Sequence, residues 1–95
     1  MKALKFEEVV LRPVVTEKTL RAAERDNAYT FEVAMNANKV QIRRAVEHLF
    51  EVGVTDVRTQ RYLGKRRRMG RSVGTTGNWK KAVIRLKEGD SIDFY

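Results

Sequence analysis

The chain has 95 residues, of which 42% are hydrophobic and 34% charged, enough for a single domain with one modest core. Its formal net charge of +8 predicts a polyanionic partner, with nucleic acid ahead of an anionic membrane surface. The absence of cysteine excludes disulfides, thiolate metal ligands and cysteine nucleophiles, and no stretch approaches the ~20 apolar residues of a membrane span, so we expect a cytoplasmic protein without membrane insertion.

The N-terminal part predicts a short edge strand followed by a helix. Val9–Arg12 is largely apolar and stops at Pro13, which cannot donate to a sheet ladder and is tolerated at a sheet edge. Thr16 can cap a helix over Glu17–Glu24, whose acidic first residue complements the helix dipole. Asp26 and Asn27 then supply turn chemistry.

The middle of the chain predicts a half-buried strand and a long helix. Ala28–Ala34 alternates in polarity, which places three side chains on one face: Tyr29, Phe31 and Val33. Asn38 and Gln41 have the spacing of a capping box, and apolar residues follow at helical spacing across residues 38–52. We expect Gly53 to end this helix.

Two further strands are predicted at Val54–Leu63 and Trp79–Lys87, the second with Ala82, Ile84 and Leu86 on one face. The tail after Lys87 reads as a turn with an apolar end that folds back. The order short strand, helix, strand, helix, strand, strand predicts an α+β sandwich of two or three layers with a mostly antiparallel four-stranded sheet. Residues 1–95 then form one RNA-binding domain, with an extended basic loop at 64–78 between the last two strands.

Positive charge is concentrated around this loop. Residues 57–87 contain eleven Lys or Arg and no Asp or Glu, whereas the rest of the chain contains nine basic and twelve acidic residues. A solvated surface normally mixes both signs, so this segment predicts a binding surface. Within the loop arginine outnumbers lysine by four to one, which favours RNA because guanidinium groups bridge phosphate oxygens and stack on unpaired bases.

The candidate RNA-binding residues are the cations of this segment together with one aromatic residue: Arg58, Arg61, Tyr62, Lys65, Arg66, Arg67, Arg68, Arg71, Lys80 and Lys81. Tyr62 precedes the loop and Trp79 follows it, and aromatic rings can stack on bases. For Tyr62, base stacking and ordinary packing remain equally open. For Trp79 we favour the interpretation that it covers the edge of the core.

Catalysis has little support in the sequence. His48 is the only histidine, and on the long helix we expect it to be a partly exposed filler rather than a base. The ligands for a metal site are missing, and the loop lacks the spacing of a nucleotide-binding motif. We therefore expect no enzymatic activity, no metal and no cofactor.

Three runs of the sequence together resemble one protein family: Leu11–Lys18 (LRPVVTEK), Asn38–Phe50 (NKVQIRRAVEHLF), and Gly64–Trp79 followed by Lys-Lys-Ala. In this order they are similar to the bacterial L twenty-three (universal name uL twenty-three) family of large-subunit ribosomal proteins, over nearly the whole chain. The resemblance implies a structural constituent of the large subunit that binds its ribosomal RNA beside the polypeptide exit tunnel.

The resemblance also implies sites and partners. The tip of the arm, formed by Met69, Gly70 and Arg71, would line the tunnel and meet the nascent polypeptide. Trigger factor and the signal recognition particle would dock at Glu17 and at the pair Phe50 and Glu51, and the neighbouring ribosomal protein L twenty-nine would be a permanent contact. From the residues alone, Glu17 reads as a first-turn acid and Phe50 as core packing, so for Phe50 both interpretations stay open.

Two other classes of function stand beside this one. A free-standing RNA chaperone or regulatory RNA-binding protein would use the same basic arm outside the ribosome. A small-molecule enzyme on a ferredoxin-like sheet would need a shaped pocket with converging polar groups, which the sequence does not indicate.

Overall fold

The computed structural model describes residues 5–62, 66–69, 72–75 and 78–93, and for the strands within 66–75 it describes the backbone. Its main sheet has four strands in the order β1-β2-β6-β3, and every neighbouring pair is antiparallel. These strands are β1 (Val10–Pro13), β2 (Ala28–Val33), β3 (Val54–Tyr62) and β6 (Trp79–Leu86). The predicted α+β class with a four-stranded antiparallel sheet is confirmed.

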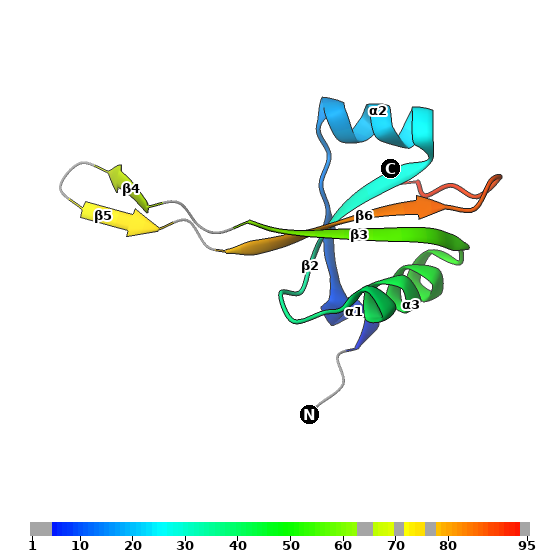
Figure 1. Cartoon of the computed structure of the whole chain (residues 1–95), viewed down its shortest axis with the longest axis horizontal. Helices are drawn as coiled ribbons and strands as arrows, with labels where there is room; N and C mark the ends of the chain where they lie inside the picture. Colours follow the sequence, from blue (N-terminus) through cyan, green and yellow to red (C-terminus); the bar gives the residue numbers. More distant parts are fainter. Residues whose placement is uncertain (1–4, 63–65, 70–71, 76–77, 94–95) are drawn as a thin grey trace.

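Helices lie on both sides of this sheet, so the domain has three layers (Figure 1). The helix α2 (Glu17–Asp26) lies on one side, and α1 (Phe6–Val9) and α3 (Lys39–Phe50) lie on the other. The four-residue helix α1 was not predicted, because one helical turn carries no periodicity. It packs against α3, where the Phe6 ring lies 4.5 Å from the His48 ring.

The core lies between the sheet and α3. Phe31 of β2, Ile42 of α3 and Ile84 of β6 are fully buried there, and burying each such side chain contributes roughly 1.5–3 kcal/mol. Phe50, at the end of α3, is half-buried with its ring 5.4 Å from that of Phe31. The alternation predicted for the last strand is confirmed, since Ala82, Ile84 and Leu86 all face this core.

The strand β2 is buried on both faces, although its alternating pattern predicted burial on one. Thr30 is 6% exposed on the face opposite Phe31. The reason is that α2 packs over this second face, placing Ala23 and Leu20 above the outward side chains of β2. A polar threonine is tolerated there because, among the described residues, no buried side-chain oxygen or nitrogen lacks a hydrogen-bond partner.

The capping predictions hold at the start of both long helices. The Asn38 side chain accepts from the Gln41 amide at 2.8 Å, and the Gln41 side chain accepts from the Asn38 amide at 2.9 Å. At α2, Thr16 and Thr19 form the same reciprocal pair, with distances of 3.2 and 2.7 Å. Each pair satisfies amides that helix geometry leaves without a partner.

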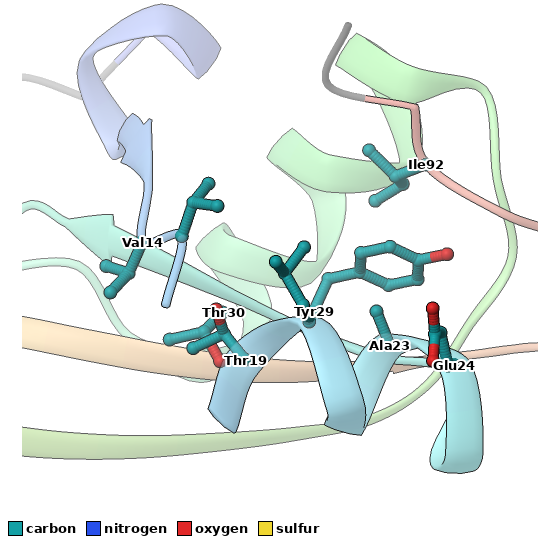
Figure 2. Close-up of a pocket in the computed structure, with 9 residues that line it drawn as sticks. Val14, Thr19, Ala23, Glu24, Tyr29, Thr30 and Ile92 are labelled. Atoms are coloured by element: carbon teal, nitrogen blue, oxygen red, sulfur yellow. The ribbon is translucent and has the colours of Figure 1, made fainter. Parts of the chain in front are cut away.

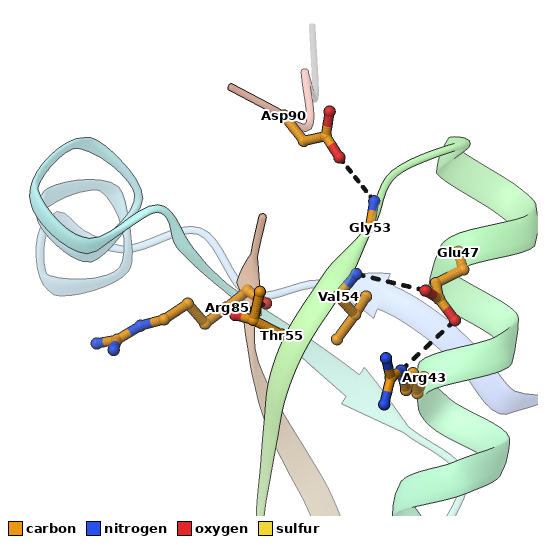
Figure 3. A network of polar contacts seen from close by, with 7 residues as sticks. All are labelled: Arg43, Glu47, Gly53, Val54, Thr55, Arg85 and Asp90. Atoms are coloured by element: carbon orange, nitrogen blue, oxygen red, sulfur yellow. Dashed lines mark hydrogen bonds and ion pairs between the residues drawn. The ribbon is translucent and has the colours of Figure 1, made fainter. Parts of the chain in front are cut away.

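The prediction that Gly53 ends the long helix was wrong. Glu51 takes the left-handed conformation at φ 53°, and the helix stops at Phe50. Gly53 instead lies against the C-terminal turn, where its amide donates to the Asp90 carboxylate at 2.7 Å (Figure 3). A Cβ on Gly53 would lie 3.3 Å from Lys87 Cβ, so close backbone approach accounts for the glycine.

Asn27 ends α2 in the left-handed conformation at φ 52° and fastens the tail to the sheet. Its side-chain amide donates to the carbonyls of Lys87 at 3.2 Å and Asp90 at 2.8 Å. The predicted fold-back of the tail is confirmed at Ile92, which is 7% exposed and belongs to the core cluster.

The basic loop contains a β-hairpin in the described residues. The strands β4 (Arg66–Met69) and β5 (Ser72–Thr75) pair antiparallel, with Arg66 opposite Thr75 and Met69 opposite Ser72. They continue the direction of β3 and β6 away from the helices (Figure 1). No helix in the described part of the chain is long and apolar enough to cross a membrane.

Candidate nucleic-acid interface

The face of the sheet that carries α2 is only half covered. The helix packs over β2, and a hollow lies between α2 and the neighbouring half formed by β6 and β3, lined by Asp26 together with Arg58 and Val83. We call this uncovered half the open face; its side chains are Arg58, Gln60, Tyr62, Trp79, Lys81, Val83 and Arg85. Cross-strand pairing sets it out in rows, with Tyr62 opposite Trp79 and Gln60 opposite Lys81.

Two aromatic rings stack where the arm leaves the sheet. The rings of Tyr62 and Trp79 lie 4.5 Å apart at an interplanar angle of 13°. The Lys81 ammonium lies 5.1 Å from the Tyr62 ring centroid, and the Tyr62 hydroxyl donates to Gln60 at 3.2 Å. Strand pairing, a cation-π contact and a hydrogen bond therefore hold the rings in place before any ligand arrives.

Trp79 corrects our interpretation that it covers the edge of the core. Because side chains alternate along a strand, Trp79 shares a face with Lys81 and Val83, opposite the core-facing Ala82. It does not belong to the hydrophobic core cluster of the described residues. On the open face its ring stacks with the ring of Tyr62.

The adjacent lysines of β6 lie in opposite environments. Lys81 is half-buried on the open face, whereas Lys80 is 7% exposed and its ammonium donates to the Ala37 carbonyl in front of α3. Burial lowers the pKa of Lys80, and the positive charge of Arg61 lowers it further. We therefore leave Lys80 out of the open face, although its charge made it a candidate for RNA binding.

The remaining predicted RNA-binding residues do not all lie together. Arg58 is on the open face, where its guanidinium lies 3.3 Å from the Asp56 carboxylate. Arg61 pairs with Lys80 and is exposed on the opposite face of the same strands. For Arg66, Arg67 and Arg68 the structure gives the backbone of β4, and Lys65 and Arg71 lie outside the described residues.

The described residues show no cluster of side chains typical of a catalytic or metal site. No group of three or more His, Cys, Asp or Glu in that part of the chain could hold a metal ion. His48 lies against the ring of Phe6 rather than beside a nucleophile. What the surface offers is fixed aromatic rings beside exposed cations, which suits binding rather than bond making.

Comparison with known proteins decides the family. A model of the family described as "Ribosomal protein L23" matches residues 8–94. The chain belongs to the ribosomal protein L23 family. Relatives named "Large ribosomal subunit protein uL23" include one from Anaeromyxobacter sp. (strain K), 51% identical over 97% of this chain and 95% of its own length. Others are from Acidithiobacillus ferrooxidans, 51% identical over 90% and 89%, and Alkalilimnicola ehrlichii, 49% identical over 99% and 95%.

The two factor-docking positions that the L23 resemblance implied lie on different sides of the sheet. Glu17 is exposed in the first turn of α2, and Phe50 and Glu51 end α3 on the other side (Figure 1). Phe50 and Glu51 are remote from the aromatic stack, since β3 starts just after Glu51 and runs for nine residues, about 30 Å, before it reaches Tyr62. Glu17 is nearer, because it follows Val14 by three residues and Val14 lines a hollow with Trp79.

An apolar hollow adjoins α2 of this L23 chain. Leu20 and Ala23 line it together with Tyr29 and Ile92, and its volume is about 240 Å³ (Figure 2). Val15, in the connection before Glu17, is 55% exposed and lines the same hollow. Exposed apolar groups beside an acidic helix start are features that protein partners use.

A second hollow, which sequence reasoning missed, lies beside Trp79. Arg12 and Pro13 of β1, Glu32 of β2 and Val14 line it with Trp79, and its volume is about 250 Å³. Arg12 and Glu32 are twenty residues apart and meet only through strand pairing. Only knowledge of the strand order could have placed them beside Trp79.

Proposed function

We propose that this L23-family chain is a structural, non-enzymatic protein of the large ribosomal subunit that binds ribosomal RNA through the open face and the arm. The observation that carries the proposal is the stacked pair Tyr62 and Trp79, held by Lys81 at the root of the arm. Aromatic rings on a sheet beside clustered cations offer an unpaired base a surface and its phosphates a counter-charge.

Charge and stacking act at different ranges in this proposal. The acid-free segment 57–87 attracts the RNA backbone and releases condensed counterions as phosphates are neutralised. Stacking then fixes the register, because each base placed on an aromatic ring contributes about 1–3 kcal/mol. Stacking on the open face therefore fixes the position of the bound RNA relative to the start of the arm.

The protein partners are assigned to the arm tip and to the ends of the helices. The arm tip, Met69 to Arg71, would line the exit tunnel next to the nascent polypeptide. Glu17, with the apolar hollow beside α2, is proposed to bind trigger factor and the signal recognition particle, as are Phe50 and Glu51. Ribosomal protein L29 is the proposed permanent neighbour. Glu17, Phe50 and Glu51 lie outside the acid-free segment 57–87.

Sedimentation of a cell extract through a sucrose gradient tests the proposal. The chain, traced by an antibody, should travel with the large subunit and remain there after a wash in moderate salt. Recovery in the free fractions, with RNA bound, would support a free-standing RNA chaperone or regulator instead.

A further inference from the structure

The hollow beside Trp79 is placed to receive one base. Because β6 lies between β3 and β2, Tyr62 contacts Trp79 from the β3 side while the hollow adjoins it from the β2 side. Trp79 thus has a ring on one side and a hollow on the other. A volume of about 250 Å³ is below the ~300–1,000 Å³ of pockets for drug-sized ligands, so a single flat group is the appropriate occupant.

Glu32 gives this hollow an unusual chemistry for a basic surface. Its side chain is 19% exposed, and its carboxylate is held by the Arg12 guanidinium at 2.9 Å and 3.4 Å. The Arg12 side chain is 72% exposed, so the pair lies at the solvent boundary. The exposed Arg12 guanidinium can move into solvent, but the largely buried Glu32 carboxylate then needs other donors in its place.

From these contacts we infer that the hollow binds an unpaired guanine of the RNA, with the base against Trp79 and its Watson–Crick edge on Glu32. The inference rests on the proposed RNA-binding function and adds a base preference to it. The guanine N1–H and N2–H groups are two parallel donors, the arrangement in which Arg12 now approaches the carboxylate. Guanine would therefore replace Arg12 at Glu32 without leaving a carboxylate oxygen unpaired.

The displaced Arg12 gains a partner in the same step. A bound nucleotide brings a phosphate close to its base, and a guanidinium at the rim of the hollow can pair with that phosphate. The carboxylate of Glu32 repels a phosphate that enters the hollow itself, so the base rather than the backbone is admitted. Uracil, cytosine and adenine do not present two adjacent donors of this kind. Each of them would leave one oxygen of the Glu32 carboxylate without a donor.

A simpler explanation is that Arg12 and Glu32 form an ordinary cross-strand ion pair. That pair accounts for the approach of the two side chains, which lie opposite each other in the β1–β2 register. It does not account for an open hollow between the pair and a tryptophan ring. A guanine site predicts that the fluorescence of Trp79 depends on which base is bound. An ordinary ion pair predicts that it does not.

Trp79 is the only tryptophan of the chain, so all tryptophan fluorescence comes from the ring that borders this hollow. The full chain is titrated with the single-stranded RNA heptamer UUUGUUU and with the three matched heptamers that carry A, C or U at the centre. We expect the guanine heptamer to quench Trp79 most and to bind at least about five-fold more tightly, the lower end of the discrimination of a bidentate contact. Equal quenching and equal affinity for the four heptamers would overturn the inference.

Variants of Glu32 and Arg12, with one control, test which residue gives the preference for guanine. Glu32→Gln should bring the ratio of guanine to uracil affinity toward one, whereas Glu7→Gln, with the same change of charge on α1, should leave it unchanged. Arg12→Ala should leave guanine the preferred base, because the Glu32 carboxylate that recognises it is still present. A ratio that survives Glu32→Gln, with circular dichroism showing an intact fold, would contradict the role of Glu32.

The anisotropy of fluorescently labelled heptamers separates this inference from the proposed function. Salt-dependent binding without base preference would overturn only the guanine site. Absence of binding to any heptamer and to large-subunit ribosomal RNA would overturn the RNA-binding function as well.

Discussion

Tyr62 and Trp79 lie directly opposite each other on β3 and β6, and their rings stack at 4.5 Å where the arm begins. The stack joins the two strands that lead into the arm, and strand alternation places it on the open face. A stacked pair in this position fixes the direction of the arm and provides a preformed surface for bases. Substitutions can separate these structural and binding roles.

Removing the Tyr62 ring should weaken RNA binding more than it weakens the fold. Tyr62→Ala loses a stacking surface, which costs about 1–3 kcal/mol per base, or roughly 5- to 150-fold in affinity. The cross-strand pair contributes only about 0.2–1 kcal/mol to stability. Fluorescence anisotropy with large-subunit RNA and urea unfolding measure the two effects, and Tyr62→Phe, which keeps the ring, is the control.

The adjacent lysines of β6 should respond in opposite ways. If Lys81 neutralises one phosphate, Lys81→Ala should reduce the slope of log affinity against log salt by ~0.7–0.9, with little change in stability. Lys80→Ala should leave the slope unchanged and cost about 1–3 kcal/mol, because the Ala37 carbonyl loses its buried donor. A reduced salt slope in Lys80→Ala would return Lys80 to the RNA-binding surface.

Lys80 should also make stability depend on pH in the alkaline range. Its pKa is lowered in the folded chain, so the unfolded chain binds this proton more tightly. The free energy of unfolding should therefore rise as pH increases from the lowered pKa toward the ordinary value of 10.5.

Lys80→Met is the matched comparison for this pH effect, because it keeps an unbranched side chain without the charge. The stability of the wild type minus that of the variant should increase with pH across the window, and the other titrating groups cancel in the difference. A difference that stays flat would contradict the buried position of the ammonium.

Reversal of charge at Glu17 should affect protein partners and leave RNA binding intact. Glu17 is exposed in the first turn of α2, so Glu17→Lys costs only about 0.3–1 kcal/mol through the helix dipole. Binding of purified trigger factor to large subunits that carry the variant should fall at least several-fold, with Glu7→Lys as the control. Failure of the variant to assemble into subunits would mean that Glu17 is structural.

Local rules in the sequence predicted much of the fold. Caps such as Asn38 with Gln41, and the alternation of β6, depend on neighbours within a few residues, so they can be read from the chain. The burial of Thr30 could not be read in this way, because it depends on α2 crossing the outer face of β2. The same holds for Gly53, whose role is set by a turn 37 residues away.

Alternation along β6 determines how two residues of the candidate site are oriented. The alternation that turns Ala82 toward the core also turns Lys80 inward and Trp79 outward. The size of Trp79 suggested the edge of the core, which was wrong. The charge of Lys80 suggested RNA binding, and its inward orientation argues against that role. The contact between Arg12 and Glu32 could not be predicted from alternation within one strand, because it depends on the order of the strands in the sheet.

The salt dependence of RNA binding by the arm tests the central claim most directly. Affinity for large-subunit ribosomal RNA is measured from low to moderate salt for the wild type, for the triple variant Arg66→Ala, Arg67→Ala, Arg68→Ala, and for a control triple variant. The control removes three exposed arginines from the helices: Arg21→Ala, Arg25→Ala and Arg44→Ala. We predict that the arm variant lowers the slope by ~0.7–0.9 for each phosphate that it no longer neutralises and that the control does not. Equal slopes for the wild type and the arm variant would contradict the assignment of the arm to RNA.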